Sequence, residues 1–191
     1  MKLHYKGKYS LDPDTLPHGE HIPGAVAFKE AANSKQMAVL ANVLSFVIAI
    51  PLMFSVFYRC WEYVSGPPVI LACIASLLCL FPHELLHAVC FRGDVYLYTN
   101  FAQGMLFVVG PETMSKQRFI FMSLLPNIVL GFVPYVLGMI FPQLFYLAFF
   151  GALSSSMGAG DYYNVFNALT QMPRGSRTYL YKFNSFWYMP E

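Results

Sequence analysis

Residues 68–91, "PVILACIASLLCLFPHELLHAVCF", form a long apolar stretch in which Glu84 is the only acidic residue. A helix needs about 20 mainly apolar residues to cross the hydrocarbon core of a bilayer. An acid at that depth costs on the order of 2–3 kcal/mol even on lenient insertion scales, so such a residue usually serves a function. We therefore interpret this stretch as a membrane span that carries a functional site.

The composition of the whole chain is also typical of a membrane protein. It has 191 residues, of which 57% are hydrophobic and 12% charged, whereas soluble domains contain about 25% charged residues. The net charge of +2 is too small to indicate nucleic-acid binding. The four cysteines lie in or beside apolar segments without a CxxC pair, so we interpret them as small apolar residues.

Three further segments are long and apolar enough to span a membrane, namely residues 37–58, 119–141 and 143–160. Four spans would place Arg59 alone on one side and the other eleven lysines and arginines on the opposite side. Basic residues are enriched in cytoplasmic loops. The sequence therefore predicts a multi-pass protein of the cell membrane with both termini in the cytoplasm.

The predicted fold class is an all-α polytopic membrane protein with four transmembrane helices. A small β-hairpin at about residues 94–110 lies between the second and third helices, because two β-prone segments flank the turn-forming "TNFAQG". Residues 1–36 are expected to form a mostly irregular cytoplasmic arm, and residues 37–170 the membrane core. Residues 171–191 interleave basic and aromatic residues, which predicts a cytoplasmic tail at the membrane interface.

The motif "HELLH" predicts a zinc site on the second span. His83 and His87 are separated by four residues, so both project from one face of a helix, one turn apart. This spacing suits two nitrogen ligands of one tetrahedral zinc ion. Glu84 lies beside them and is the candidate catalytic base, because its carboxylate can take a proton from water activated by the metal.

Asp161 is the candidate third metal ligand. His83 and His87 lie 15 and 19 residues after Pro68, and Asp161 lies 18 residues after Gln143. At about 1.5 Å per residue, two helices that run in the same direction would bring these residues to nearly one level. An N-cap role for Asp161 on a short following helix is the alternative, and both roles are compatible.

Asn127 and Asn164 are the remaining candidate site residues. Both are polar residues near or within membrane segments. Either amide could stabilise an oxyanion or orient a substrate. Either could instead form a hydrogen bond between helices, which is the more frequent role of such residues. The sequence leaves both alternatives open.

Two motifs resemble known families. "PHELLHAVCF" together with "GAGDYYNV" resembles an uncharacterised bacterial family of zincin peptidases, the domain-of-unknown-function 3267 family. The motif order also resembles the site-2 proteases, which are intramembrane zinc metalloproteases, although these typically carry an NPxxxLDG-type motif where this chain has "GAGDYYN". The resemblance covers residues 70–170. It implies that His83, His87 and Asp161 are zinc ligands and that Glu84 is the catalytic base.

The resemblance further implies a mode of substrate binding and a function. A strand near the active site, either residues 95–98 or residues 105–109, would pair with an unwound peptide or membrane-protein substrate. The alternative is a hairpin that only closes the cytoplasmic mouth of the site. We expect a membrane-embedded zinc metalloendopeptidase that cleaves in or near a membrane segment. The alternative is a non-catalytic membrane protein with a structural or regulatory zinc site, closed by a fourth ligand such as a cysteine or Glu112.

Overall fold

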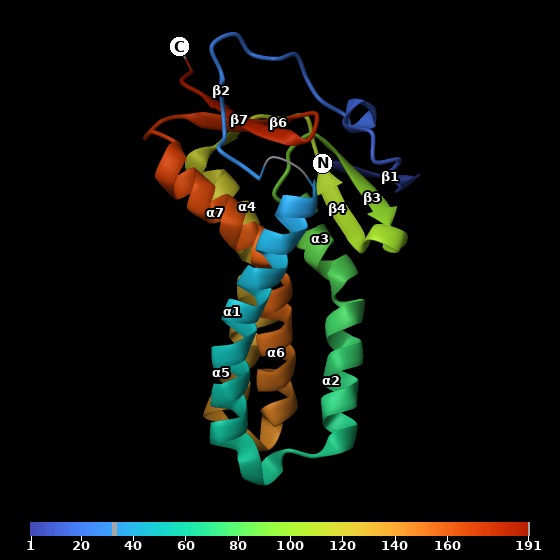
Figure 1. Cartoon of the computed structure of the whole chain (residues 1–191), viewed down its shortest axis with the longest axis vertical. Helices are drawn as coiled ribbons and strands as arrows, with labels where there is room; N and C mark the ends of the chain where they lie inside the picture. Colours follow the sequence, from blue (N-terminus) through green and yellow to red (C-terminus); the bar gives the residue numbers. More distant parts are fainter. Residues whose placement is uncertain (32–33, 191) are drawn as a thin grey trace. The chain divides into compact units, whose positions relative to one another are not determined.

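The computed structural model describes residues 1–31 and 34–190. Its helices and strands belong to two compact units, and each is described by itself (Figure 1). The helical unit comprises Ala31–His83 and Leu124–Tyr163. The sheet unit comprises Met1–Glu30, Glu84–Ser123 and Asn164–Glu191.

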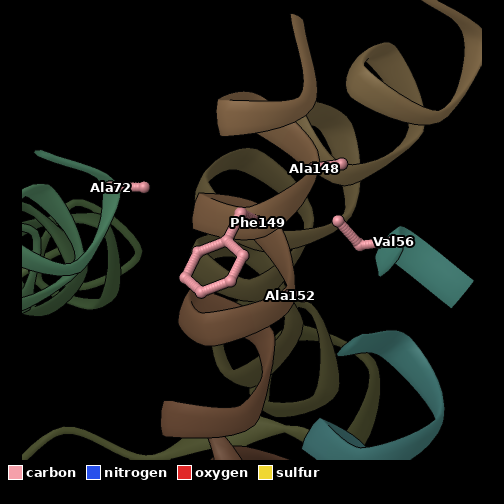
Figure 2. Close-up of a cluster of buried hydrophobic side chains, with 5 residues drawn as sticks. All are labelled: Val56, Ala72, Ala148, Phe149 and Ala152. Atoms are coloured by element: carbon pink, nitrogen blue, oxygen red, sulfur yellow. The ribbon is translucent and has the colours of Figure 1, made fainter. Parts of the chain in front are cut away.

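The helical unit is built around helix α6, which contacts the three other long helices of the unit. Their bounds are α1, Ser34–Cys60; α2, Gly66–Leu78; α5, Val133–Ile140; and α6, Phe145–Met157. Figure 2 shows the apolar cluster at this centre, with Val56 of α1, Ala72 of α2, and Ala148, Phe149 and Ala152 of α6. Small side chains on α6 allow this close packing, as is common between membrane helices.

Glycines bring α5 and α6 into contact at two places. A Cβ atom on Gly138 of α5 would overlap the backbone of Ala148, and one on Gly151 of α6 would overlap the backbone of Tyr135. Both positions therefore require glycine unless the helices move apart. Contacts between small residues of this kind are common where membrane helices pack together.

Three helical stretches are long and apolar enough to cross a membrane: Lys35–Tyr63, Gly66–Ala88 and Lys116–Ile140. Large apolar side chains on α1 remain exposed, among them Phe46, Ile50 and Phe54, each at least 66% exposed. Apolar surface of this extent on one helix is unfavourable in water. The helices are thus consistent with membrane association.

The prediction of an all-α protein with four spans is wrong. The expected fourth span, residues 143–160, contains only the 13-residue helix α6, which is about 20 Å long and shorter than a bilayer core. The helix ends at Met157, and a new helix, α7 (Ala159–Gln171), begins after Gly158. The prediction that both termini are cytoplasmic depended on the count of four spans. It loses that support and stays a prediction.

The three-stranded sheet of the sheet unit contains the expected hairpin and one strand more. Strands β3 (Asp94–Asn100) and β4 (Met105–Val109) pair antiparallel and form the hairpin. Strand β1 (Lys2–Lys8) pairs parallel with the other edge of β3, which gives the order β1-β3-β4. Because β3 is paired on both sides, β4 is an edge strand.

The second sheet joins segments from both ends of the chain. Its order is β2 (Val26–Ala27), β7 (Asn184–Tyr188), β6 (Arg177–Tyr181) and β5 (Met114–Ser115), and all of its pairs are antiparallel. Strands β1 and β2 lie before residue 37, within the expected arm, and the sequence did not predict them; more than half of the described residues of the arm lie outside helices and strands. The division into arm, core and tail by membrane position stays a prediction.

The helices that carry the candidate site connect the two units along the chain. Helix α3 (Leu80–Ala88) passes from the helical unit to the sheet unit after His83. Helix α4 (Lys116–Pro126) continues into a π-helical segment, Asn127–Phe132. Helix α7 passes to the sheet unit after Tyr163. The positions of the candidate residues are therefore described within each unit or within one helix.

Candidate metal centre

The "HELLH" motif lies on helix α3, which starts anew after a break at Cys79. Pro82 is the third residue of α3, where a missing N–H costs little because the first turn has no intrahelical acceptor for it. The geometry of this one helix brings the ligand atoms of His83, Glu84 and His87 within 4.8 Å of one another. Two imidazoles and a carboxylate thus share one helical face, as the sequence predicted.

His87 is the most buried residue of this group, with 8% of its surface exposed. Its Nδ1 lies 2.9 Å from the backbone carbonyl oxygen of Met122 on α4, within the sheet unit. A carbonyl oxygen only accepts, so Nδ1 must donate, and the lone pair of the neutral ring is then at Nε2. Metal-ligating histidines are usually oriented by such a hydrogen bond from the second ring nitrogen.

Asp161 meets His83 within the helical unit. The Oδ2 of Asp161 lies 3.0 Å from the Nε2 of His83, and each side chain is 13–14% exposed. Nitrogen and oxygen ligands about 2.1 Å from a tetrahedral zinc ion lie roughly 3.4 Å apart. A nitrogen and a carboxylate oxygen at 3.0 Å therefore fit two ligands of one ion after a small adjustment. Asp161 is the third residue of α7 rather than its N-cap.

Asn127 is directed at the same carboxylate. Its Nδ2 donates to the Oδ2 of Asp161 at 2.7 Å, and the residue is 3% exposed. It is the first residue of the π-helical segment, and such segments are frequent at functional sites. A Cβ atom on Gly158 would overlap the Asn127 amide, so the glycine leaves the space that this amide occupies.

Asn164, the other candidate asparagine, belongs to the sheet unit. It is the sixth residue of α7 and half-buried. Asp161 and Asn164 are three residues apart, which makes them neighbours on the surface of one helix. Its assignment as an oxyanion-stabilising or substrate-orienting residue stays a prediction.

Glu84 contacts the edge strand of the three-stranded sheet. Its Oε2 accepts a hydrogen bond of 3.1 Å from the backbone N–H of Val108 in β4. This N–H points to α3 and therefore away from β3. Because the backbone groups of successive residues in a strand alternate in direction, those of Leu106, two residues earlier, also point away from β3. The candidate base therefore lies at the edge of β4, one of the two strands that the resemblance left open as the strand near the site.

Glu112 has structural partners of its own in the sheet unit. Its Oε2 accepts hydrogen bonds from the backbone N–H groups of Arg92 and Gly93, both at 2.7 Å, and its Oε1 lies 2.6 Å from Arg118. The Nε of Arg118 also donates to the carbonyl oxygen of Cys90. Burial acts to raise the pKa of Glu112, but these donors outweigh it and lower the pKa. Glu112 thus ties the residues after α3 to α4.

One comparison with known proteins gives a match. A family model described as "Putative zincin peptidase" matches residues 76–177, more than half of the chain. The matched range includes the motif on α3 and Asp161 on α7. No curated protein and no solved structure matches the chain, and the resemblance to site-2 proteases rests on the motifs alone.

Proposed function

The chain belongs to the zincin peptidase family of domain-of-unknown-function 3267, and from this premise we propose that it is a membrane-embedded zinc metalloendopeptidase. The family itself suggests a zinc metallopeptidase. The observation that supports the proposal best is the group on α3, whose ligand atoms lie within 4.8 Å, together with Asp161 at 3.0 Å from His83. Cleavage in or near a membrane segment is the further part of the proposal.

Three residues would hold the metal: His83, His87 and Asp161. Bound zinc supplies Lewis acidity, which polarises a carbonyl group and makes water more acidic. The carbonyl of Met122 fixes the tautomer of His87, and Asn127 orients the carboxylate of Asp161. Each of these contacts reduces the freedom of a ligand before the metal binds.

Glu84 would move the proton during hydrolysis. Its carboxylate takes a proton from the attacking water and then gives one to the leaving amine, the usual course of general acid–base catalysis. The hydrogen bond from Val108 keeps the Glu84 side chain at the β4 edge. The base is thereby held on the side of α3 where a peptide paired with β4 would lie.

The substrate would be an extended peptide segment that adds to β4. Of the two strands considered from the sequence, β3 is paired with β1 and β4, so β4 alone of the two has a free edge. Outward-facing backbone groups at Leu106 can pair with a peptide, and Val108, two residues further on, contacts Glu84. A segment unwound from a membrane helix has the unpaired backbone groups that this pairing requires.

The alternative, a non-catalytic protein with a structural zinc site, has less support. A structural zinc ion usually has four protein ligands. The carboxylate of Glu112 is already bound by Arg118 and two backbone N–H groups. Within residues 1–31 and 34–190, no cysteine belongs to the group of possible metal ligands on α3. These observations favour a site with an open fourth position.

The proposal is tested with the purified full-length protein in lipid nanodiscs. Zinc content and cleavage of a panel of single-span membrane peptides are measured for wild type, Glu84→Gln and Asp161→Ala. We expect about one zinc per chain in wild type and Glu84→Gln, a 10²–10⁴-fold slower cleavage by Glu84→Gln, and loss of zinc from Asp161→Ala.

Glu62→Gln is the matched control, because Glu62 is an exposed acid beyond the end of α1. It should retain both zinc and cleavage. Cleavage by Glu84→Gln at the wild-type rate would contradict the assigned base. Stoichiometric zinc in Asp161→Ala would contradict the ligand assignment, and zinc without any cleavage by wild type would favour the non-catalytic alternative.

A further inference from the structure

The part of helix α7 that belongs to the sheet unit carries two large apolar side chains at the surface. Phe166 and Leu169 are each 60% exposed, and residues three apart share one helical face. Thr170 follows Leu169, and its hydroxyl donates to the backbone carbonyl of Phe166 at 2.7 Å, so its donor is used within the helix. Single exposed apolar residues are common in water as well. The surroundings of this face therefore decide what it contacts.

The buried side of α7 packs against a helix that begins a candidate membrane span. Ala168 and Met172 of α7 belong to one apolar cluster. Phe119 and Ile120 of α4 pack against that cluster. Both lie in the stretch Lys116–Ile140, which is long and apolar enough to cross a membrane. The end of α7 therefore lies beside the first turns of that stretch.

Lys116 fixes the level of α7 along this stretch. Its Nζ donates to the carbonyl oxygens of Met172 at 2.6 Å and Leu169 at 3.4 Å, at the end of α7. Lys116 is the first of 25 residues, and at about 1.5 Å per residue these exceed the roughly 30 Å of a bilayer core. The first turn would then reach the lipid headgroups, where lysine side chains are favoured. Leu169 would lie at the same level.

Arg174 lies in the turn that follows α7. The turn is held beside the start of α4, because the backbone N–H of Lys116 donates to the carbonyl oxygen of Ser176 at 3.3 Å. Arg174 itself is exposed. Residues 162–190 contain three basic residues and no acidic residue. The charge on this side of the helix end is therefore positive.

Lys29 adds a second exposed cation at the same end of α7. The side chain of Gln171 accepts a hydrogen bond of 2.7 Å from the backbone N–H of Lys29 and donates to its carbonyl oxygen at 3.4 Å. The neighbouring acid, Glu30, has its own contact, since its Oε2 accepts from the backbone N–H of Ser185 at 3.3 Å. Two exposed cations thus lie at the end of a helix whose exposed face is apolar.

We propose that Phe166, Leu169, Lys29 and Arg174 form a surface that binds the anionic lipids of the bilayer. The two apolar side chains would enter the boundary between headgroups and acyl chains, as on an interfacial helix. The two cations would meet lipid phosphates, to which basic residues near an anionic surface are attracted. The membrane location of this surface rests on the proposed function. The same helix carries Asp161, so the lipid would support the helix of a proposed metal ligand.

The first test is photo-crosslinking of the full-length protein in vesicles of equal amounts of phosphatidylcholine and phosphatidylglycerol. Benzoylphenylalanine replaces Phe166, and in separate proteins it replaces Phe54 or Glu20. Phe54 of α1 is 71% exposed and should contact lipid, whereas Glu20 is an exposed acid of the sheet unit. Mass spectrometry should find lipid adducts at positions 166 and 54 and few at position 20.

Two results of this experiment overturn the inference. One is a yield of lipid adducts at position 166 that is no higher than at position 20. The other is a cross-link from position 166 to a second copy of the chain in place of lipid, which would assign the surface to a protein interface.

The second test measures the preference for anionic lipid as the ratio of phosphatidylglycerol to phosphatidylcholine adducts at position 166. The ratio should exceed one, and Arg174→Gln or Lys29→Gln should each lower it by up to about fivefold. Lys182→Gln is the matched control, because it removes the same charge from a lysine whose Nζ lies 2.5 Å from Asp14. It should leave the ratio unchanged. A ratio of one, or equal ratios in all proteins, overturns the role of the two cations.

The comparison of positions 166 and 54 separates this inference from the proposed function. Lipid adducts at position 54 without adducts at position 166 would overturn only the lipid contact of α7. A lack of lipid adducts at position 54 would contradict the membrane-embedded location in the proposed function. Neither measurement requires zinc or a substrate.

Discussion

Asn127 donates a hydrogen bond of 2.7 Å to Asp161, at the same carboxylate oxygen that lies 3.0 Å from His83. A buried amide thus controls the orientation of the acid that we assign as a metal ligand. Contacts of this kind to a ligand usually change metal affinity by 10–100-fold.

Replacement of Asn127 by alanine should weaken zinc binding by 10–100-fold, because the Asp161 carboxylate loses its donor. Chelator competition measures the affinity, and the absorption spectrum of the cobalt-substituted protein reports on ligand geometry. Asn42→Ala is the control, since Asn42 donates to the backbone carbonyl of Ala38 in its own helix of the same unit. Unchanged zinc affinity with a reduced kcat would instead indicate that Asn127 stabilises an oxyanion during the reaction.

Replacement of Gly158 by alanine should have a similar effect on zinc without touching a ligand. The added Cβ atom overlaps the Asn127 amide, which must move away from Asp161. We expect zinc affinity to fall at least tenfold and Tm to decrease. Gly160→Ala is a matched control two residues away, where a Cβ atom meets open space. Equal affinities of the two variants would show that Asn127 can move without consequence.

Replacement of Val108 by proline should test the role of the β4 edge without disrupting the pairing of β4 with β3. The N–H of Val108 is directed at Glu84 rather than at β3, so its loss removes no bond between strands. We expect a folded protein that binds zinc and cleaves at least tenfold more slowly. Phe107→Pro, which removes an inward-facing N–H, should lower Tm by more. Wild-type cleavage by Val108→Pro would exclude β4 as the substrate strand near Glu84.

Replacement of Glu112 by glutamine should destabilise the protein in a pH-dependent way. Burial acts to raise the pKa of Glu112, but backbone donors and Arg118 hold it below the ordinary value of 4.5. The carboxylate therefore contributes stability above pH 4.5, and this contribution disappears as pH falls through the lowered pKa. Glu112→Gln should lose about 1.5–3 kcal/mol at pH 7.

The difference between Glu112→Gln and wild type should shrink as the pH is lowered below 4.5. Thermal unfolding between pH 3 and pH 7 measures it, with Glu62→Gln as an exposed acid that should show no difference. A gap between wild type and Glu112→Gln that is the same at every pH would show that the charge of Glu112 contributes nothing.

The sequence could predict which polar residues lie together better than it could predict the structure around them. The spacing of His83 and His87 specifies a shared helical face, because helix periodicity is a local property. Asp161 was found by comparing depths along two helices, and it lies 3.0 Å from His83. The four-span count failed because hydropathy alone does not reveal that the helix stops before Gly158. Composition also concealed the sheets, since β1 pairs with β3, about 90 residues away.

The sequence by itself determined the "HELLH" motif, the apolar helices and the family of this protein, since each follows from short runs of residues that are neighbours along the chain. Only the tertiary structure decided that Asn127 is bound to Asp161, that β4 is the free strand beside Glu84, and that Ser154 lies in a pocket with His83. Those relationships join residues 24 to 71 positions apart. They depend on the packing of helices and strands, which no local periodicity specifies.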